Sequence, residues 1–330
     1  MSKNIEISIL GTGNMGTALA KLISGNGYRV KMWGIDQEAI NNINTHHENK
    51  KFLPGVPLND HVTAHLELSE TIKNTKIIIV AVPTQVTQGV SEKMATYLNK
   101  EQIILSASKG IEMNTGLTVT KIIKKHIPRF CQKNLAVLMG PLFASEISQG
   151  VPTVGVIATS KIYNFKILKE VFQNSTFFVR YSKDLIGAEL AGALKNVYAI
   201  ILGVCDGLGY GWNTKSAAIT AAIKEMALVG TYLGGRKETF YELAGMGDLL
   251  TTGFGEKSRN RRFGEKVCSG LSVNDVLKEI GQVVEGASTV KILSRLLQKS
   301  KIKTPLLKAV NDLVNDKKDP CQIMLQILEK

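Results

Sequence analysis

A glycine-rich turn at residues 11–16 constrains the fold of this chain more than any other feature of its sequence. The turn, Gly-Thr-Gly-Asn-Met-Gly, follows the apolar run Ile5–Leu10 and precedes residues 17–23, whose apolar side chains have helical spacing. In such a strand–turn–helix unit the first glycine permits the tight turn, the second lets the backbone approach a pyrophosphate, and the third lets helix and strand pack closely. The helix N-terminus offers free N–H groups to phosphates. The turn therefore predicts a dinucleotide site.

Apolar stretches with strand character recur along the first half of the chain. They lie at residues 28–33, 77–82, 103–108, 135–139, 153–158 and 176–181. Residues 77–82, Ile-Ile-Ile-Val-Ala-Val, are apolar on both faces, which is typical of a central parallel strand. Strands that alternate with helical patterns predict an α/β fold with a doubly wound sheet over residues 1–184.

From about Asp184 the pattern changes to helical periods with loops marked by glycine, which predicts an all-helical domain over residues 185–330. The first long helix is expected from Ile186 to Cys205. On its helical wheel Lys195 is the one charge in a stripe of alanine and glycine, and Asn196 follows it. Lys195 is either a lysine that snorkels from a buried helix or a partly buried functional ammonium. We favour the second interpretation.

The composition is that of a globular protein of about two domains, with 44% hydrophobic and 21% charged residues. The formal net charge is +13. The lysines are scattered, often beside carboxylates, and no basic stretch alternates with aromatic residues. This pattern favours a solvated surface over a nucleic-acid partner.

Cysteine and histidine usage narrows the chemistry. The four cysteines are far apart, without metal-ligand or redox spacing, so reduced thiols and no metal site are expected. All five histidines lie in the first 126 residues. An acid–base group in the helical domain is therefore expected to be Lys, Asp, Glu, Tyr or Cys.

The hydropathy pattern predicts a cytoplasmic protein that is not embedded in a membrane. No apolar run approaches the roughly 20 residues that span a bilayer. The N-terminus lacks the apolar region of a signal peptide, because its apolar stretch is short and leads directly into the glycine turn.

Three residues of the first domain are candidates for ligand contact. Asp36 lies 20 residues beyond Gly16, where a carboxylate can bind the adenosine ribose, and the competing interpretation is an N-cap of the helix expected at residues 37–44. Pro83 follows the strand at 77–82, at the end where ligands bind in open α/β sheets. Lys109 follows the strand at 103–108. We interpret it as part of an ordered site that attracts a phosphate or polarises a carbonyl, rather than as a surface lysine.

In the second domain, Asp248 is a single carboxylate in an apolar segment flanked by glycines, where a helix N-cap is the competing interpretation. Ser258, Arg259 and Asn260 bring together hydroxyl, guanidinium and amide groups, the types that grip a phosphate by charge-assisted hydrogen bonds. Arginines in such a cluster can also form a solvated face.

Together these motifs resemble the NAD(P)-dependent glycerol-3-phosphate dehydrogenase family of bacterial type. The motifs are GTGNMGTALA, VPTQV, SASKG, GPLFA, GAELAGALKNVYAI, AGMGDL, KSRNRRFG and GQVVEG, and their order is specific. The resemblance implies a Rossmann-like doubly wound N-terminal domain (1–184) and an all-helical substrate domain (185–330). It implies reversible hydride transfer between NAD(P)H and dihydroxyacetone phosphate, giving sn-glycerol 3-phosphate for glycerophospholipid synthesis.

The resemblance also assigns residues. Those implied to contact NAD(H) or NADP(H) are Gly11, Gly13, Asn14, Met15, Gly16, Trp33, Lys109, Ala144, Arg259, Val283 and Glu285, to which the reasoning above adds Asp36 and Pro83. Those implied to contact the phosphorylated triose are Lys109, Gly140, Leu142, Lys195, Asn196, Asp248, Ser258, Arg259 and Asn260. Lys195 is implied to be the proton acceptor, and Lys109 is expected to be the second catalytic residue.

The chain departs from the family pattern at several positions. Met15 stands where an aromatic residue is frequent, and Leu142 replaces a serine or threonine, so one hydrogen bond to substrate is lost. Phe254 and Gly255 lie in a segment that usually differs. Ile35 stands where histidine or arginine is frequent, and together with Asp36 it favours NADH over NADPH.

Two alternatives stay open. One is a β-hydroxyacid or 6-phosphogluconate-type dehydrogenase, which shares the two-domain plan and a lysine–asparagine pair, although the motifs AGMGDL and KSRNRRFG argue against it. The other is a non-catalytic protein that senses NADH. The missing hydroxyl at Leu142 is its only support, whereas Lys109, Lys195, Asp248 and Arg259 are all present. Faces of small residues in the helical domain favour a homodimer.

Overall fold

The structure is a computed structural model that describes residues 5–315 and 319–328. The chain forms two compact units. The first comprises Met1–Lys109 with Thr118–Leu185, and the second comprises Gly110–Leu117 with Ile186–Lys330. A single boundary after residue 184 therefore leaves out one short segment, Gly110–Leu117, which belongs to the second unit by its contacts.

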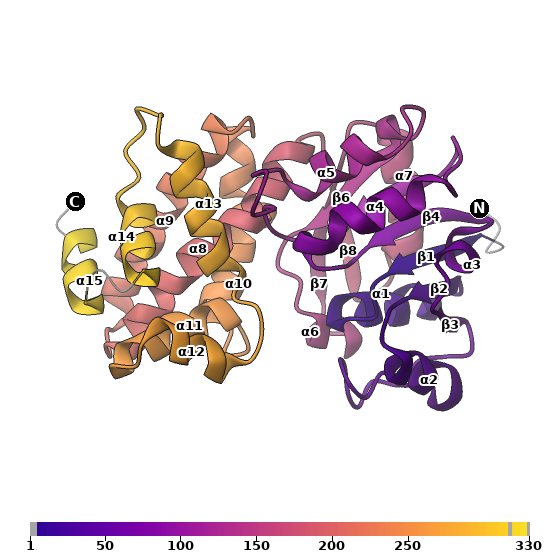
Figure 1. The fold of residues 1–330 in the computed structure, drawn as a ribbon, viewed down its shortest axis with the longest axis horizontal. Helices are drawn as coiled ribbons and strands as arrows, with labels where there is room; N and C mark the ends of the chain where they lie inside the picture. Colours follow the sequence, from indigo (N-terminus) through magenta and orange to yellow (C-terminus); the bar gives the residue numbers. More distant parts are fainter. Residues whose placement is uncertain (1–4, 316–318, 329–330) are drawn as a thin grey trace. The chain divides into compact units, whose positions relative to one another are not determined.

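The first unit is built on an eight-stranded sheet with the order β3-β2-β1-β4-β5-β6-β7-β8 (Figure 1). The strands are β1 (Glu6–Leu10), β2 (Arg29–Trp33), β3 (Val62–His65), β4 (Thr75–Val80), β5 (Ile103–Ser106), β6 (Leu135–Met139), β7 (Thr153–Thr159) and β8 (Phe177–Ser182). All neighbouring strands are parallel except β6 and β7. Strand order reverses at β1, which makes its carboxyl end the ligand-binding position of a doubly wound sheet. The predicted fold class is confirmed.

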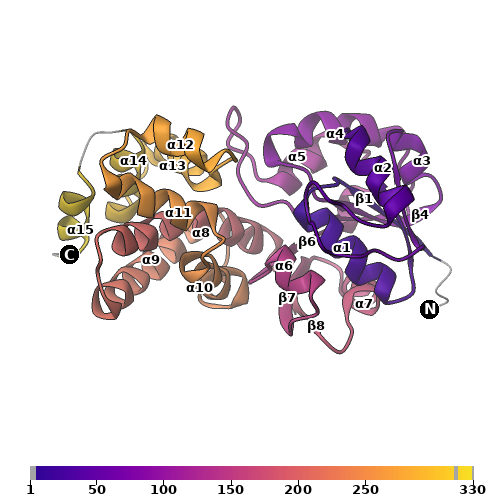
Figure 2. The ribbon, with the colours of Figure 1, turned by 90° about the horizontal axis from the view of Figure 1, so that it is seen from below.

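Helices cover both faces of this sheet, as the apolar run in β4 requires. Ile77 and Ile79 pack in one core and Ile78 and Val80 in the other. The helices of the unit are α1 (Asn14–Gly25), α2 (Gln37–His46), α3 (Leu68–Ile72), η1 (Thr84–Val86), α4 (Thr87–Ala95), α5 (Val119–His126), η2 (Gln132–Asn134), α6 (Ala144–Ser148) and α7 (Ile162–Phe172). Figure 2 shows α4 and α5 on one side of the sheet and α1 and α7 on the other.

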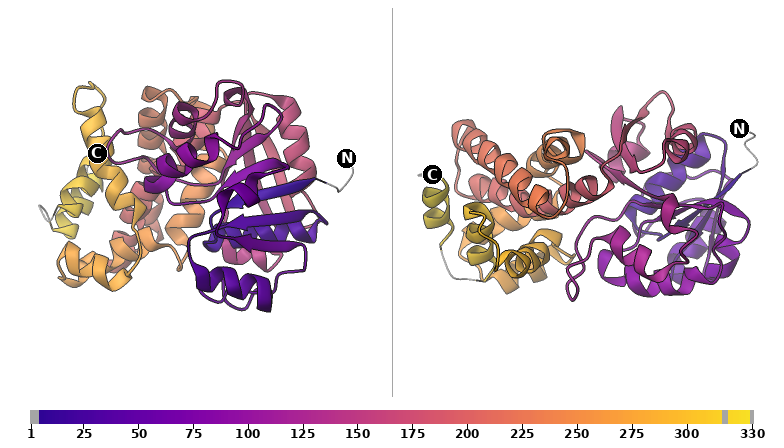
Figure 3. Two further views of the ribbon diagram at one scale, coloured as in Figure 1. Left: turned by 45° about the vertical axis from the view of Figure 1, so that its right-hand side comes forward. Right: turned by 90° about the horizontal axis from the view of Figure 1, so that it is seen from above.

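Strand β3 was not expected from the sequence. It has only four residues, of which Val62 and Ala64 are buried, so its apolar signal is short. It pairs with β2 at the edge of the sheet. In the left view of Figure 3 the N-terminal strands, coloured indigo and purple, lie side by side.

The second unit is helical, as predicted. Its elements are α8 (Leu185–Gly207), α9 (Trp212–Tyr232), η3 (Lys237–Tyr241), η4 (Leu243–Gly247), α10 (Asp248–Phe254), α11 (Arg259–Lys266), η5 (Val267–Ser269), α12 (Val273–Ile280), α13 (Glu285–Leu297), α14 (Pro305–Val314) and α15 (Pro320–Leu328). Every residue of α8 from Gly187 to Cys205 is buried. The other helices of the unit therefore pack around α8.

Helix α8 corrects one expectation about hydropathy. By length and composition it passes as a candidate membrane span, so the statement that no apolar run approaches that length is wrong. However, 89% of its apolar window is buried inside the structure, as in the core helix of a globular unit. The apolar surface that suggests a span is thus used for packing between helices.

Candidate functional site

The glycine turn between β1 and α1 has the geometry that its sequence predicts. A Cβ atom at Gly16 would lie 2.0 Å from the carbonyl oxygen of Gly11, so only glycine lets the helix start there. Gly13 differs, because apart from its own chain neighbours no described atom lies within 4 Å of the place that its Cβ would occupy. Gly16 thus serves the packing of the turn, whereas Gly13 keeps open the space in front of the helix.

The start of α1 fits a phosphate. Gly13 is the N-cap residue and carries no side chain to satisfy the first N–H groups, and the first turn holds no acidic residue. The positive end of the helix dipole therefore faces the open space beside Gly13 without a competing carboxylate. Asn14 is exposed, and Met15 packs partly against the core of the unit. These residues fit a dinucleotide pyrophosphate.

Asp36 caps α2, which confirms one of the two interpretations of this residue. Its Oδ1 accepts a hydrogen bond of 3.0 Å from the N–H of Ala39, and its Oδ2 lies 2.5 Å from Nζ of Lys51. The hydrogen bond from Lys51, followed by that from Ala39, lowers the pKa of Asp36. Ile35, immediately before it, is 85% exposed.

Trp33 is fixed at the end of β2 by a hydrogen bond of 2.8 Å from its Nε1 to the carbonyl of Leu66.

Lys109 is ordered at the carboxyl ends of neighbouring strands. Its Nζ donates a hydrogen bond of 3.0 Å to the carbonyl of Gly140, just after β6. Its own carbonyl accepts a bond of 3.3 Å from the hydroxyl of Thr84, which follows Pro83 after β4. These contacts hold the side chain and main chain of Lys109 in place, and its role toward a phosphate or a carbonyl stays a prediction. Leu142, by contrast, is buried in the core, while Ala144 is half-buried at the start of α6.

Lys195 occupies the buried side of α8 in the second unit. Its Nζ donates to Oδ1 of Asp248 at 2.9 Å and to the hydroxyl of Thr252 at 2.5 Å (2.5 Å is short for such a bond). Since Lys195 is only 7% exposed, it does not snorkel to solvent. The structure thus places a buried ammonium between two fixed oxygen acceptors.

Asp248 is the first residue of α10, and its side chain does not cap that helix. The N-cap residue is Gly247, and the Asp248 carboxylate is directed to Lys195 instead, so the N-cap interpretation is wrong. Thr252 follows one helical turn later, which puts both side chains on one face of α10. Sequence reasoning missed Thr252. The spacing of four residues from Asp248 was the available signal.

Asn196, Asn260 and Gly286 form a chain of hydrogen bonds between three helices. Nδ2 of Asn260 donates to Oδ1 of Asn196 at 2.9 Å, and the N–H of Gly286 donates to Oδ1 of Asn260 at 2.9 Å. A Cβ at Gly286 would lie 2.4 Å from the carbonyl oxygen of Asn196, so α13 needs glycine to approach α8 so closely. These contacts tie α11 and α13 to the helix that carries Lys195.

The cluster Ser258–Asn260 contains one exposed guanidinium. The hydroxyl of Ser258 caps α11 by accepting a hydrogen bond of 3.3 Å from the N–H of Arg261. Arg259, the first residue of α11, is exposed. Arg261 instead forms an ion pair of 2.6 Å with Asp206 and serves the packing of the unit. Arg259 and Arg262 are both exposed and can reach an external anion, whereas Arg261 is engaged by Asp206.

Glu285 and Val283 lie where α13 begins. Burial raises the pKa of Glu285, and the positive charge of Arg259 offsets part of this effect. Val283 is 59% exposed.

The predicted site residues form two groups, one in each unit. Among the residues that the structure describes, no group of three or more His, Cys, Asp and Glu side chains is placed to hold a metal ion.

Comparisons with known proteins give a consistent result. The family models of the N-terminus and the C-terminus of NAD-dependent glycerol-3-phosphate dehydrogenase match residues 6–164 and 184–325. The chain is 41% identical over 312 residues to the glycerol-3-phosphate dehydrogenase (NAD(P)+) of Bacillus licheniformis, covering 94% of this chain and 90% of that protein. The corresponding protein of Bacillus velezensis is 39% identical over 309 residues, with 94% and 90% covered. The crystal structure of glycerol-3-phosphate dehydrogenase from Coxiella burnetii matches with a TM-score of 0.92 and 30% identity, covering 99% of this chain and 100% of that one.

Proposed function

This chain belongs to the family of NAD-dependent glycerol-3-phosphate dehydrogenases and is an NAD(P)-dependent oxidoreductase, and on this basis we propose that Lys195 transfers the proton of its reaction. The family acts on a glycerol-phosphate or triose-phosphate substrate. The proposed reaction interconverts dihydroxyacetone phosphate and sn-glycerol 3-phosphate. The observation that carries the proposal is the buried contact of Lys195 with Asp248 and Thr252.

When bound, the cofactor would supply or accept the hydride at C2 of the substrate. The oxygen on C2 gains a proton in one direction of the reaction and loses it in the other. Lys195 donates that proton when the substrate is reduced and accepts it in the reverse reaction. Asp248 accepts a hydrogen bond from Nζ of Lys195 and fixes its direction, and the Thr252 hydroxyl provides a second fixed contact. Orientation of the ammonium by two side chains reduces the reorganisation that proton transfer requires.

Binding of the phosphate is assigned to Arg259 at the start of α11. Its guanidinium is exposed and can form charge-assisted hydrogen bonds to a phosphate dianion. Ser258 shapes the first turn of the helix, and Asn260 with Asn196 keeps that turn in place. Lys109 adds positive charge where the alkoxide develops, and its contact with Gly140 orders the side chain.

The pyrophosphate of the cofactor is assigned to the start of α1, beside Gly13. The open space at Gly13 and the absence of an acidic residue in the first turn support this assignment. The adenosine is assigned to the end of β2, near Trp33 and Asp36. Exposed Ile35 offers no charge to a 2′-phosphate, and the Asp36 carboxylate repels one, so both residues favour NADH. Lys51 lies beside Asp36, and its positive charge favours the 2′-phosphate of NADPH instead.

Assembly and location are also proposals. Exposed Leu228 and Tyr232, one turn apart on α9, support a homodimer through the helical unit, which sedimentation velocity can test. The four cysteines are unpaired with one another, in line with a reducing compartment such as the cytoplasm, where the product would feed glycerophospholipid synthesis.

The test is a spectrophotometric assay of NADH consumption with dihydroxyacetone phosphate. Turnover in the wild type, its loss in Lys195→Ala and retained NADH binding in that variant are the expected results. Faster turnover of a β-hydroxyacid, or binding of NADH without turnover of any substrate, would contradict the proposal. Rates with NADPH, measured in parallel, decide cofactor preference.

A further inference from the structure

The segment Gly110–Leu117 follows Lys109 directly but belongs to the other unit. Lys109 is the last residue of its stretch of the first unit, and Gly110 is the first residue of a segment grouped with the helices. Gly110 has a φ of 149°, a conformation that is essentially restricted to glycine. The peptide bond between Lys109 and Gly110 therefore joins a proposed catalytic residue to a segment held by the helical unit.

The segment is internally braced by Glu112. The carboxylate of Glu112 accepts hydrogen bonds from the N–H of Asn114 (3.2 Å), the N–H of Thr115 (2.7 Å) and the Thr115 hydroxyl (2.6 Å). The N–H of Glu112 donates to the carbonyl of Leu117 at 2.9 Å, which closes the turn. The segment can thus transmit a constraint placed on its middle to its ends.

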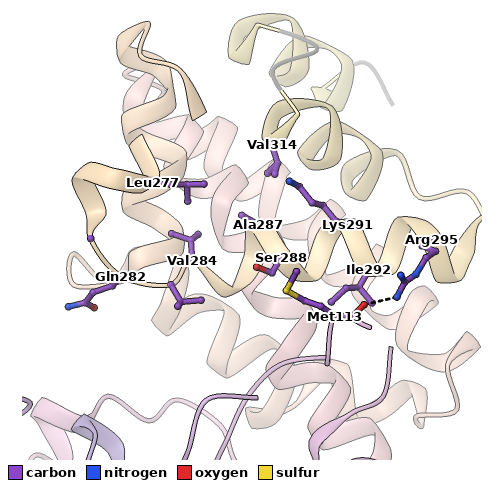
Figure 4. A pocket seen from close by; sticks show the side chains of 12 residues that line it. Met113, Leu277, Gln282, Val284, Ala287, Ser288, Lys291, Ile292, Arg295 and Val314 are labelled. Carbon is purple, nitrogen blue, oxygen red and sulfur yellow. Dashed lines mark hydrogen bonds between the residues drawn. The ribbon is translucent and has the colours of Figure 1, made fainter. Parts of the chain in front are cut away.

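Arg295 on α13 supplies such a constraint. Its Nη2 donates to the carbonyls of Met113 at 2.7 Å and Asn114 at 3.3 Å. Figure 4 shows the guanidinium directed to the Met113 main chain, beside a cavity that Met113 and Ile292 help to line. On the next residue, a methyl carbon of Leu296 lies 3.0 Å from the place that a Cβ of Gly116 would occupy. The helix therefore holds the segment at two adjacent points.

The same helix is fixed at its other end to the residues around Lys195. Gly286, in the first turn of α13, binds Asn260, which binds Asn196 next to Lys195. A continuous series of contacts thus runs from Lys195 along α13 to the segment that starts beside Lys109.

We propose that Arg295 is a positioning residue for the dehydrogenase reaction, acting by holding Gly110–Leu117 and thereby the main chain of Lys109. The inference rests on the proposed function, because it assumes that Lys109 contacts the substrate. Arg295 itself contacts neither substrate nor cofactor in this proposal. Its loss should impair the use of dihydroxyacetone phosphate and leave the affinity for NADH unchanged.

The test compares kcat/KM for dihydroxyacetone phosphate in Arg295→Ala, Lys109→Ala and the double variant. Arg295→Ala is expected to lower kcat/KM by about tenfold to a hundredfold, the effect of a misplaced reacting group. Arg295→Lys should recover part of the loss, since its ammonium can still bind a carbonyl. In the Lys109→Ala background, Arg295→Ala should change kcat/KM by less than about twofold. The Kd of NADH, from fluorescence titration, should stay the same in Arg295→Ala.

Lys291→Ala is the matched control. Lys291 lies one turn earlier on α13, is exposed, and lines the same cavity, and no described residue pairs with it. It should keep wild-type kinetics. If Arg295→Ala fails to fold, as judged by circular dichroism, Glu112→Gln weakens the same segment and carries the same expectations.

Two outcomes would overturn this inference and leave the proposed function standing. One is wild-type kinetics in Arg295→Ala. The other is that Arg295→Ala lowers kcat/KM by the same factor in the wild-type background and in the Lys109→Ala background. Wild-type kinetics in Lys109→Ala would contradict the proposed role of Lys109 and this inference with it. The two failures are therefore distinguishable.

Discussion

The ammonium of Lys195 lies 2.9 Å from the carboxylate of Asp248, and the two side chains are only 8% and 2% exposed. Burial of both charges costs desolvation energy that their attraction barely offsets. Two apolar residues of similar volume would pack at least as well. Stability alone therefore does not account for the pair, which is in line with the proposed role of Lys195 as an oriented ammonium.

Replacement of Asp248 by Asn should damage both stability and activity. It leaves the Lys195 ammonium buried without its counter-charge, so the free energy of unfolding should fall by about 3–5 kcal/mol. The double variant Lys195→Met, Asp248→Leu should regain most of this loss while staying inactive. Urea unfolding followed by circular dichroism measures both. Equal stability of Asp248→Asn and the wild type would rule out the charged buried pair.

Thr252→Val should lower kcat/KM for dihydroxyacetone phosphate about tenfold to a hundredfold, since a hydrogen bond to a charged group is worth about 1.5–3 kcal/mol. The volume of the side chain is nearly unchanged. Thr251→Val is the matched control, because the Thr251 hydroxyl donates to the carbonyl of Gly247 and does not bind Lys195. Steady-state kinetics of both variants provide the test. Equal losses in both would show that the effect is one of helix packing.

Gly13→Ala and Gly16→Ala should separate cofactor binding from folding. A methyl group at Gly13 meets open space, so stability should change by less than about 1 kcal/mol while the Kd of NADH rises at least about tenfold. A methyl group at Gly16 collides with the backbone of Gly11, so the free energy of unfolding should fall by about 1–3 kcal/mol. Fluorescence titration and urea unfolding measure the two effects. Unaltered NADH affinity in Gly13→Ala would exclude the proposed pyrophosphate site.

Glu285 should give the stability of the protein a pH dependence. Burial raises its pKa above the ordinary value of 4.5, so the folded state binds this proton more tightly than the unfolded state. The contribution of protonated Glu285 to the free energy of unfolding is fully present below the unfolded pKa and is lost as the pH rises through the raised folded pKa. The stability of Glu285→Gln relative to the wild type should therefore be higher at about pH 8 than at about pH 4. Urea unfolding at both pH values checks this, and a stability difference that does not vary with pH would contradict it.

Much of the fold could be predicted because its signals are local. The turn at residues 11–16 and the apolar run of β4 each contain their own evidence, as glycine spacing and burial on both faces. Strand β3 could not be predicted in this way, since it has four residues and two of them are buried. The segment Gly110–Leu117 is held to the helical unit by Arg295, which lies more than 170 residues later in the chain. No local sequence pattern indicates that contact.

In the candidate site, too, some features have a local sequence signal and others depend on contacts with distant residues. The stripe of small residues around Lys195 correctly indicated a buried ammonium. Thr252 could not be assigned as a partner of Lys195 from the sequence, and Asp248 in its glycine-flanked segment had a helix N-cap as the competing interpretation. The internal hydrogen bonds of Asn260 also escaped prediction, since an amide beside an arginine resembles a ligand contact until the neighbouring helix is placed.

The discontinuity of the helical unit has a practical consequence for recombining this protein with its relatives. The chain passes between the units after Lys109, after Leu117 and after Leu185. A chimera joined once at residue 185 would combine the 110–117 turn of one parent with the Arg295 helix of another. Exchange of the helical half as an interchangeable part therefore requires three junctions, with the eight-residue insert travelling together with the helices that bind it.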